Sequence, residues 1–133
     1  MSDVERLLSA FRTGALLRPA ADSLNCIDLA RAVARMAGVQ DLSTGPGADE
    51  ISSLIGDPDH LVLVVVDGLG VNLVEQLPAA SFLRQHVAAE LLAAFPSTTA
   101  VALTSYATGL WPNQHAVTSW WTHLPEINEP ATM

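Results

Sequence analysis

The stretch from Leu61 to Gly70 constrains the fold of this chain more than any other. Six apolar residues, four of them valine, form an unbroken run that is followed by Asp67 and two glycines, Gly68 and Gly70. A run this short and this rich in β-branched residues predicts a fully buried parallel strand. Ligands of open α/β sheets bind beyond the carboxyl ends of the strands, so we expect Asp67 to lie at a binding site.

Composition bounds the class of protein. At 133 residues, half of them hydrophobic, the chain is expected to form one globular domain. Six arginines, no lysine and fourteen acidic residues give a net charge of −8. Because binding to a nucleic-acid backbone needs a basic face, this balance argues against such a partner.

The single cysteine, Cys26, excludes an internal disulfide, and we expect it to be a small packed residue rather than a catalytic one. The N-terminus lacks the basic and apolar regions of a secretory signal. No apolar run approaches the roughly 20 residues that a membrane helix needs. We therefore expect no membrane segment and a cytoplasmic location.

Charge is distributed unevenly along the chain. Between Val87 and Pro125 the only formally charged residue is Glu90. The same stretch holds five aromatic residues, Phe95, Tyr106, Trp111, Trp120 and Trp121. Such a segment is unusual on the surface of a small free-standing domain. We expect it to be covered by further protein, either a C-terminal continuation or a tightly bound partner.

The periodicity of the apolar residues, together with the positions of glycine, proline and capping residues, predicts the following elements. Helices are expected over 2–12, 23–38, 71–76, 78–85 and 99–108, with a single turn at 50–55, and strands over 61–66, 91–95 and 117–124. Residues 41–49 and 110–115 are expected to be loops, and the tail from Pro125 shows no clear element. The alternation of strand and helix from residue 61 onward is the pattern of an α/β fold.

Two predicted strand ends carry polar side chains that together suit a metal-dependent reaction. One end offers Asp67, and the other offers Ser97, Thr98 and Thr99 at the start of a helix. A helix N-terminus favours a phosphate, and a divalent metal held by a carboxylate can turn a neighbouring hydroxyl into a nucleophile. Taken singly, Thr99 is more simply explained as a helix cap and Asp67 as a turn residue.

Three motifs in order make the chain recognisable. They are Val-Val-Asp-Gly-Leu-Gly ending at Gly70, Phe-Pro-Ser-Thr-Thr-Ala ending at Ala100, and Ala-Thr-Gly-Leu-Trp-Pro-Asn-Gln-His ending at His115. This arrangement resembles the start of the type I phosphodiesterase/nucleotide pyrophosphatase family, which belongs to the alkaline phosphatase superfamily. The resemblance covers residues 61–115 and extends more weakly to the helix that begins near Ser23.

The resemblance implies a partial alkaline-phosphatase-like α/β fold, with parallel strands and flanking helices, that is incomplete without further C-terminal residues. Residues 1–58 would be a helical lead-in, and 59–133 the N-terminal part of the catalytic domain. It implies an enzyme that hydrolyses small phosphate esters or diesters through a threonine nucleophile.

The resemblance also assigns roles to single residues. Thr99 would be the nucleophile, and Asp67 and Thr99 would bind two divalent metal ions, for which we expect zinc. The backbone N–H of Ala100 would help to hold the phosphate. Trp120 stands where many relatives have a substrate-binding asparagine, which leaves the substrate open.

Part of the family pattern is missing. The family completes its metal sites downstream with Asp-x-x-x-His, Asp-His and a last His, and none of the histidines here stands in such a pattern: His60, His86, His115 and His123. His115 is expected to be structural, and Ala116 follows it where the family has glycine. A catalytic zinc takes three protein ligands, so we expect this chain alone to bind zinc weakly and to turn over little or nothing.

Two alternatives stay open beside an N-terminal portion of a phosphate ester hydrolase. The chain could be a complete, non-catalytic interaction module that binds through its apolar C-terminal half. It could also be one half of a split enzyme whose second chain supplies the missing metal ligands.

Overall fold

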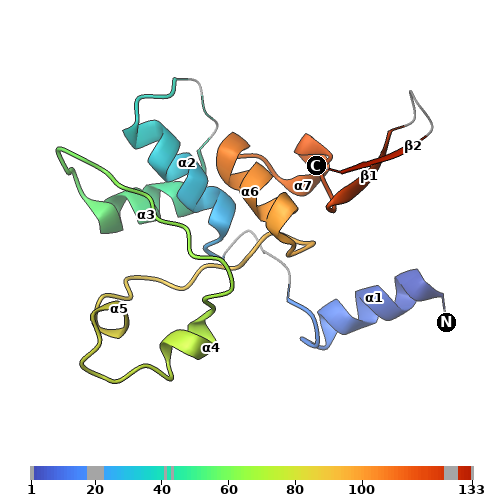
Figure 1. Cartoon of the computed structure of the whole chain (residues 1–133), viewed down its shortest axis with the longest axis horizontal. Coiled ribbons are helices and arrows are strands. Elements are labelled where there is room, and N and C mark those ends of the chain that lie inside the picture. The colour runs from blue at the N-terminus through green and yellow to red at the C-terminus, as the bar shows by residue number, and fades with distance from the viewer. Residues whose placement is uncertain (1, 18–22, 41, 43, 125–128, 133) are drawn as a thin grey trace.

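The computed structural model describes residues 2–17, 23–40, 42, 44–124 and 129–132 (Figure 1). In these residues the chain forms, in order, α1 (Asp3–Arg12), α2 (Cys26–Met36), α3 (Pro46–Ile55), α4 (Val71–Val74), α5 (Phe82–Gln85), α6 (Thr99–Thr108), α7 (Pro112–His115), β1 (Trp121–Leu124) and β2 (Glu129–Thr132). Figure 1 shows α2, α3, α6 and α7 gathered together, with α4 and α5 to one side and α1 and the hairpin to the other.

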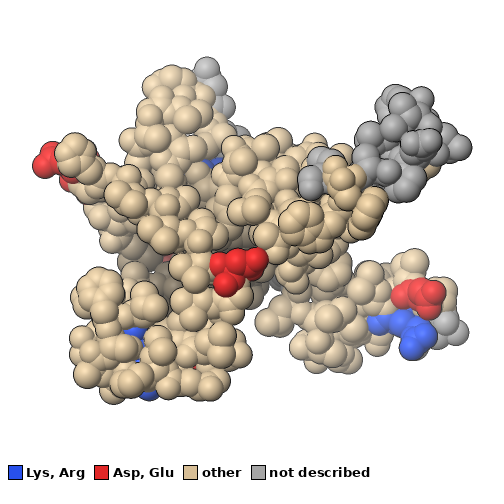
Figure 2. All heavy atoms as spheres, in the orientation of Figure 1, with Lys and Arg blue, Asp and Glu red and all other residues tan. Residues whose placement is uncertain are grey.

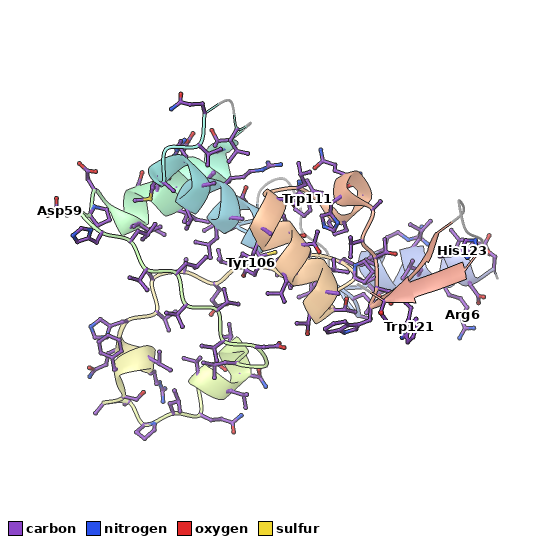
Figure 3. All side chains as sticks on the ribbon, turned by 45° about the horizontal axis from the view of Figure 1, so that its top comes forward. Arg6, Asp59, Tyr106, Trp111, Trp121 and His123 are labelled. Carbon is purple, nitrogen blue, oxygen red and sulfur yellow. The ribbon has the colours of Figure 1, made fainter. Side chains whose placement is uncertain are left out.

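The core lies where α2 packs against α3 and α6. One cluster of buried residues joins α2 to α6, with Tyr106 and Trp111 packed on it; its members are Cys26, Ile27, Ala94 and Val101. Figure 3 shows Tyr106 and Trp111 in the middle of the molecule, beside α6. A second cluster joins α2 to α3 and contains Ala32, Ala48 and Ile51.

Cys26 is a packed residue, as the sequence predicts. Its side chain is 4% exposed, and burial raises the pKa of its thiol, which disfavours the reactive thiolate.

The start of α2 ties the N-terminal helices to the segment that leads into α6. Asn25 caps the helix, because its Oδ1 accepts hydrogen bonds from the N–H groups of Ile27 and Asp28. Around it the Cys26 N–H donates to the Leu92 carbonyl, and the Leu92 N–H donates to the Leu24 carbonyl. This isolated parallel bridge fixes residues 91–94 against the first turn of α2.

The predicted α/β fold with parallel strands is wrong. Residues 61–66 form no strand: their side chains are between 40% and 82% exposed, and within the described residues their backbone groups make no hydrogen bonds. Residues 91–95 form only the bridge at Leu92. The strands in the described residues are β1 and β2, an antiparallel pair with Trp121 opposite Thr132.

The error has a physical cause. A run of β-branched apolar residues favours an extended backbone, but a strand exists only where neighbouring strands accept and donate its hydrogen bonds. The described segments on either side of the run are helices and turns, so the run stays extended without pairing.

Other elements differ from expectation in their bounds. The single turn expected at 50–55 is the end of α3, which begins earlier because Pro46 occupies its first turn. The helix expected over 78–85 is reduced to α5, which Ser81 caps. A short helix, α7, replaces part of an expected loop, and β2 forms in a tail for which no element was expected.

The helices α1 and α6 are confirmed. Ser2 caps α1 through a capping box with Glu5, and α6 runs over the expected residues until Gly109, whose φ of 64° ends it. In the part of the chain that the structure describes, no helix has the length and apolar character needed to cross a membrane. The cytoplasmic location and the division of the chain at residue 58 stay predictions.

Replacing Asn25 by alanine removes the cap of α2 and leaves the buried N–H of Ile27 and the partly buried N–H of Asp28 without their acceptor. We expect the free energy of unfolding to fall by about 1–2 kcal/mol, measured by urea denaturation. The matched control is Ser53→Ala in α3, which removes an exposed hydroxyl bonded to the Asp49 carbonyl and should change stability by less than about 0.5 kcal/mol. Equal stability of Asn25→Ala and wild type would contradict the assigned cap.

Asp28 gives the stability a predictable pH dependence. Burial raises the pKa of its carboxyl, while a hydrogen bond from the Asn25 backbone and the Arg31 charge act in the opposite direction. A pKa that is higher in the folded state stabilises the fold at low pH, and this contribution is lost as pH rises through the folded value. The stability of wild type relative to Asp28→Asn should therefore fall, in urea titrations, as the pH rises from about 3.8, the ordinary pKa of the carboxyl, through its higher value in the folded state. Parallel pH profiles of the two proteins would refute this.

Candidate active site

The N-terminus of α6 presents donors that have no partner. Thr98 is the N-cap residue, with an extended backbone, and its carbonyl accepts from the N–H of Ala102. Within the described residues, the N–H groups of Thr99, Ala100 and Val101 make no hydrogen bond. These groups and the positive end of the helix dipole form an environment that favours an anion.

A carboxylate from a distant part of the sequence lies at this helix start. Asp67 follows the extended run 61–66, and Gly68 next to it has a φ of 74°, a conformation that glycine adopts without strain. The Thr99 hydroxyl donates a hydrogen bond of 3.2 Å to Oδ2 of Asp67, although the two residues are 32 positions apart. The structure thus brings together the two residues that the sequence singles out.

Only one of the three consecutive hydroxyl residues contacts the carboxylate. Ser97 is exposed and makes no side-chain hydrogen bond within the described residues. Oγ1 of Thr98 is buried and finds no partner there. Thr99 is partly buried and Asp67 is exposed, so a ligand can reach the pair.

The pair fits one side of a metal site but does not complete one. A carboxylate oxygen and a hydroxyl oxygen are both suitable ligands for a divalent cation. Among the described residues, however, no three side chains of His, Cys, Asp or Glu come together as a metal site would require. A catalytic zinc takes three protein ligands, which is more than this pair provides.

Within the described residues, none of the histidines makes a hydrogen bond or an ion pair with Asp67. His60, His86 and His123 are exposed, and His86 stacks on the ring of Phe82. Figure 3 places Asp59, beside His60 in sequence, and His123 at opposite ends of the view. His115 is partly buried, and its Nε2 lies 3.1 Å from Oγ of Ser105.

The two remaining candidates differ in their surroundings. Ala100 is buried at 8% exposure in the first turn of α6, with its N–H free. Trp120 precedes β1, is 49% exposed, and makes no hydrogen bond to Thr99 or Asp67. The structure thus places Ala100 at the pair and shows no contact of Trp120 with it.

Sequence reasoning missed the contact between His115 and Ser105. The two residues are ten positions apart and separated by the end of α6, so no helical or strand spacing relates them. A turn between α6 and α7 brings them together, and no local sequence signal marks it.

Most of the face shown in Figure 2 is uncharged, with the acidic and basic side chains in a few separate places. A cavity of about 390 Å³ opens between α3 and the segment of α4 and α5. Its lining is apolar apart from His86 and includes Leu29, Ile51, Leu54, Val74 and Leu83. Neither Asp67 nor Thr99 lines it, so it is separate from the polar pair.

Comparison with known proteins places the chain in a family. The model of the type I phosphodiesterase / nucleotide pyrophosphatase family matches residues 61–131, a range that contains both Asp67 and Thr99. No curated protein and no solved structure shows a significant match. The matched range covers more than half of the residues of this chain. The chain therefore belongs to the type I phosphodiesterase / nucleotide pyrophosphatase family.

Proposed function

We propose that this chain provides the nucleophile and one metal-binding carboxylate of a hydrolase that cleaves phosphate esters. Membership of the family itself indicates phosphodiesterase or pyrophosphatase chemistry on phosphate-ester substrates. The observation that carries the finer assignment is the 3.2 Å hydrogen bond from the Thr99 hydroxyl to Asp67 at the open start of α6. It supports Thr99 as nucleophile because a carboxylate beside a hydroxyl is the arrangement in which that hydroxyl can be activated.

In the proposed reaction, the Thr99 oxygen attacks the phosphorus atom of the substrate. A bond forms between Oγ1 and phosphorus, the bond to the leaving alcohol breaks, and the hydroxyl proton ends on that alcohol. The oxygen of a water molecule then attacks the phosphorus of the phosphothreonine, the bond between phosphorus and Oγ1 breaks, the phosphate product leaves, and Oγ1 takes a proton from that water. The free N–H groups of Thr99 and Ala100 lie where they would donate to phosphoryl oxygens while charge develops on them.

Asp67 and Thr99 are the residues that would hold metal in this chain. Two divalent ions, for which we propose zinc, would lower the pKa of the hydroxyl and neutralise charge on the phosphoryl group. Asp67 is suited to this because it is exposed and its Oδ2 already faces Thr99.

The remaining ligands would come from polypeptide outside these residues, either a continuation of the chain or a second chain. The apolar run 61–66 is exposed directly before Asp67, and a cavity of about 440 Å³ opens between the end of α2 and residues 56–63, which include the start of this run. Exposed apolar surface of this extent marks a place where protein binds. We therefore propose that the chain alone is inactive and that the covering polypeptide completes the site.

Removing the proposed nucleophile tests the assignment. In the protein encoded by the complete source gene, with zinc present, Thr99→Ala should lower the turnover of an aryl phosphodiester by at least about 10³-fold. Ser97→Ala is the matched control, since it removes an exposed hydroxyl from the same cluster, and it should keep wild-type turnover. Undiminished turnover in Thr99→Ala would refute the role of Thr99.

The same assay separates the alternatives. If the whole-gene product lacks hydrolysis while residues 1–133 form a monodisperse unit with a cooperative melt, the interaction module is favoured. Activity that returns only when a separate histidine- and aspartate-rich chain is added would indicate a split enzyme.

Metal binding tests Asp67 separately from catalysis. We expect the 133-residue chain to bind zinc weakly, and Asp67→Asn to weaken that binding by about tenfold or more, because an amide is a poorer ligand than a carboxylate. Calorimetric titration measures both affinities, with Asp57→Asn as a control that removes an exposed acid elsewhere on the chain. An equal affinity for zinc in wild type and Asp67→Asn would show that Asp67 does not bind the metal.

A further inference from the structure

We propose that His115 is a positioning residue: through a neutral imidazole with its proton on Nε2, it fixes α6 and with it the Thr99 hydroxyl. The inference rests on the proposed role of Thr99 for its catalytic consequence. The hydrogen-bond geometry that supports it is independent of that role.

The two ring nitrogens of His115 have different partners. Nδ1 lies 3.1 Å from the backbone N–H of Val117, which can only donate, so Nδ1 must be the acceptor. The ring proton of the neutral imidazole is then on Nε2, which lies 3.1 Å from Oγ of Ser105. Nε2 therefore donates to Ser105, and the contact assigns the tautomer.

This hydrogen-bond pattern excludes His115 as a base for Ser105 and opposes its use as a metal ligand. The ring cannot act as a base towards Ser105, because the nitrogen that faces the hydroxyl already carries a proton. It cannot bind a metal without losing a contact, because the lone pair on Nδ1 accepts from Val117. Ser105 is 0% exposed, and within the described residues its hydroxyl hydrogen-bonds only to the His115 ring, so losing the ring would leave a buried hydroxyl without that partner.

Three contacts along α6 set its position. Val101 is 0% exposed and packs in the cluster with Ile27, and Nε of Arg31 donates to the carbonyl of Gly109 at 2.8 Å, just beyond the end of the helix. The His115 bond holds Ser105, between these two anchors. Since a helix moves as a unit, a shift or rotation at Ser105 is transmitted to Thr99, and a hydrogen bond tolerates only a few tenths of an ångström.

The backbone after α7 depends on the same ring. Ala116 has a φ of 62°, the only positive φ of a non-glycine residue among those described. This conformation is unfavourable for alanine, and it directs the Val117 N–H to Nδ1 of the preceding histidine. His115 thus joins α6, the end of α7 and the chain that follows.

Two substitutions separate the two ring contacts. In His115→Gln the side-chain amide can place an N–H near Nε2 and keep the bond to Ser105. In His115→Asn the amide oxygen can replace Nδ1 as acceptor, but the side chain is too short to reach Ser105. We expect kcat of the whole-gene product on an aryl phosphodiester to fall by about 10- to 100-fold in His115→Asn, with KM nearly unchanged, and to be largely restored in His115→Gln.

A control variant and a second test variant separate a direct effect on kcat from a loss of stability. Ile51→Val lowers stability in the cluster between α2 and α3, away from α6, and should leave kcat unchanged at temperatures where the protein is folded. Ser105→Ala keeps the ring and removes its acceptor, so it should reproduce the loss seen in His115→Asn. A kcat that follows stability alone across all four variants, or wild-type kcat in Ser105→Ala, would overturn the proposal.

A measurement without activity keeps the inference separate from the proposed function. In ¹⁵N-labelled 133-residue chain at neutral pH, the His115 ring should show a protonated Nε2 and an unprotonated Nδ1. The Thr99 amide signal should shift in His115→Asn and stay in place in His115→Gln. A ring protonated on Nδ1 would overturn the positioning role even if Thr99 is the nucleophile. Full turnover in Thr99→Ala would instead refute the proposed function and leave the ring assignment standing.

Discussion

The packing of α6 on α2 is the interaction on which the candidate site depends. Val101 and Ile27 are fully buried against each other's helices, and Ala94 closes the same cluster just before α6 begins. Hydrogen bonds of the capped start of α2 with Leu92 hold the segment that enters α6. Because this contact fixes where α6 starts, it also fixes the hydroxyl of Thr99. Asp67, at the end of the run 61–66, accepts the hydrogen bond of that hydroxyl, and the chain turns after it at Gly68.

Local sequence signals predicted the elements that carry their own caps. Ser2, one of the two capping candidates beside Asp3, begins α1, and Gly109 ends α6 as expected, because caps act within a few residues of each other. The convergence of Asp67 and Thr99 was also predicted, although from strand ends that the structure does not contain. What failed was the pairing of the run 61–66, since a strand is defined by partners that lie elsewhere in the sequence. The contact of His115 with Ser105 was not predicted for a similar reason, because it depends on a turn between two helices.

Ala116 links the family pattern to backbone geometry. The family has glycine after this histidine, and the structure explains that preference because the position is left-handed, with a φ of 62°. Alanine at this position carries strain that the hydrogen bonds of His115 oppose. Replacing the family's glycine by alanine therefore makes the left-handed backbone at position 116 less favourable. It leaves the hydrogen bonds of His115 intact.

The exposure of Asp67 to solvent limits how strongly Asp67 and Thr99 can stabilise charge on a substrate. Asp67 is open to solvent, and in water a charge interacts with its surroundings far more weakly than in an enclosed site. Stabilisation of a transition state needs fixed dipoles in a place from which water is excluded. The apolar run 61–66 ends at Asp67, so any polypeptide that buries this run must also lie beside the carboxylate. Covering the run would thus remove exposed apolar surface and, in the same step, take water away from Asp67 and Thr99. The proposed covering polypeptide would thus serve both the burial of this run and the chemistry proposed for the pair.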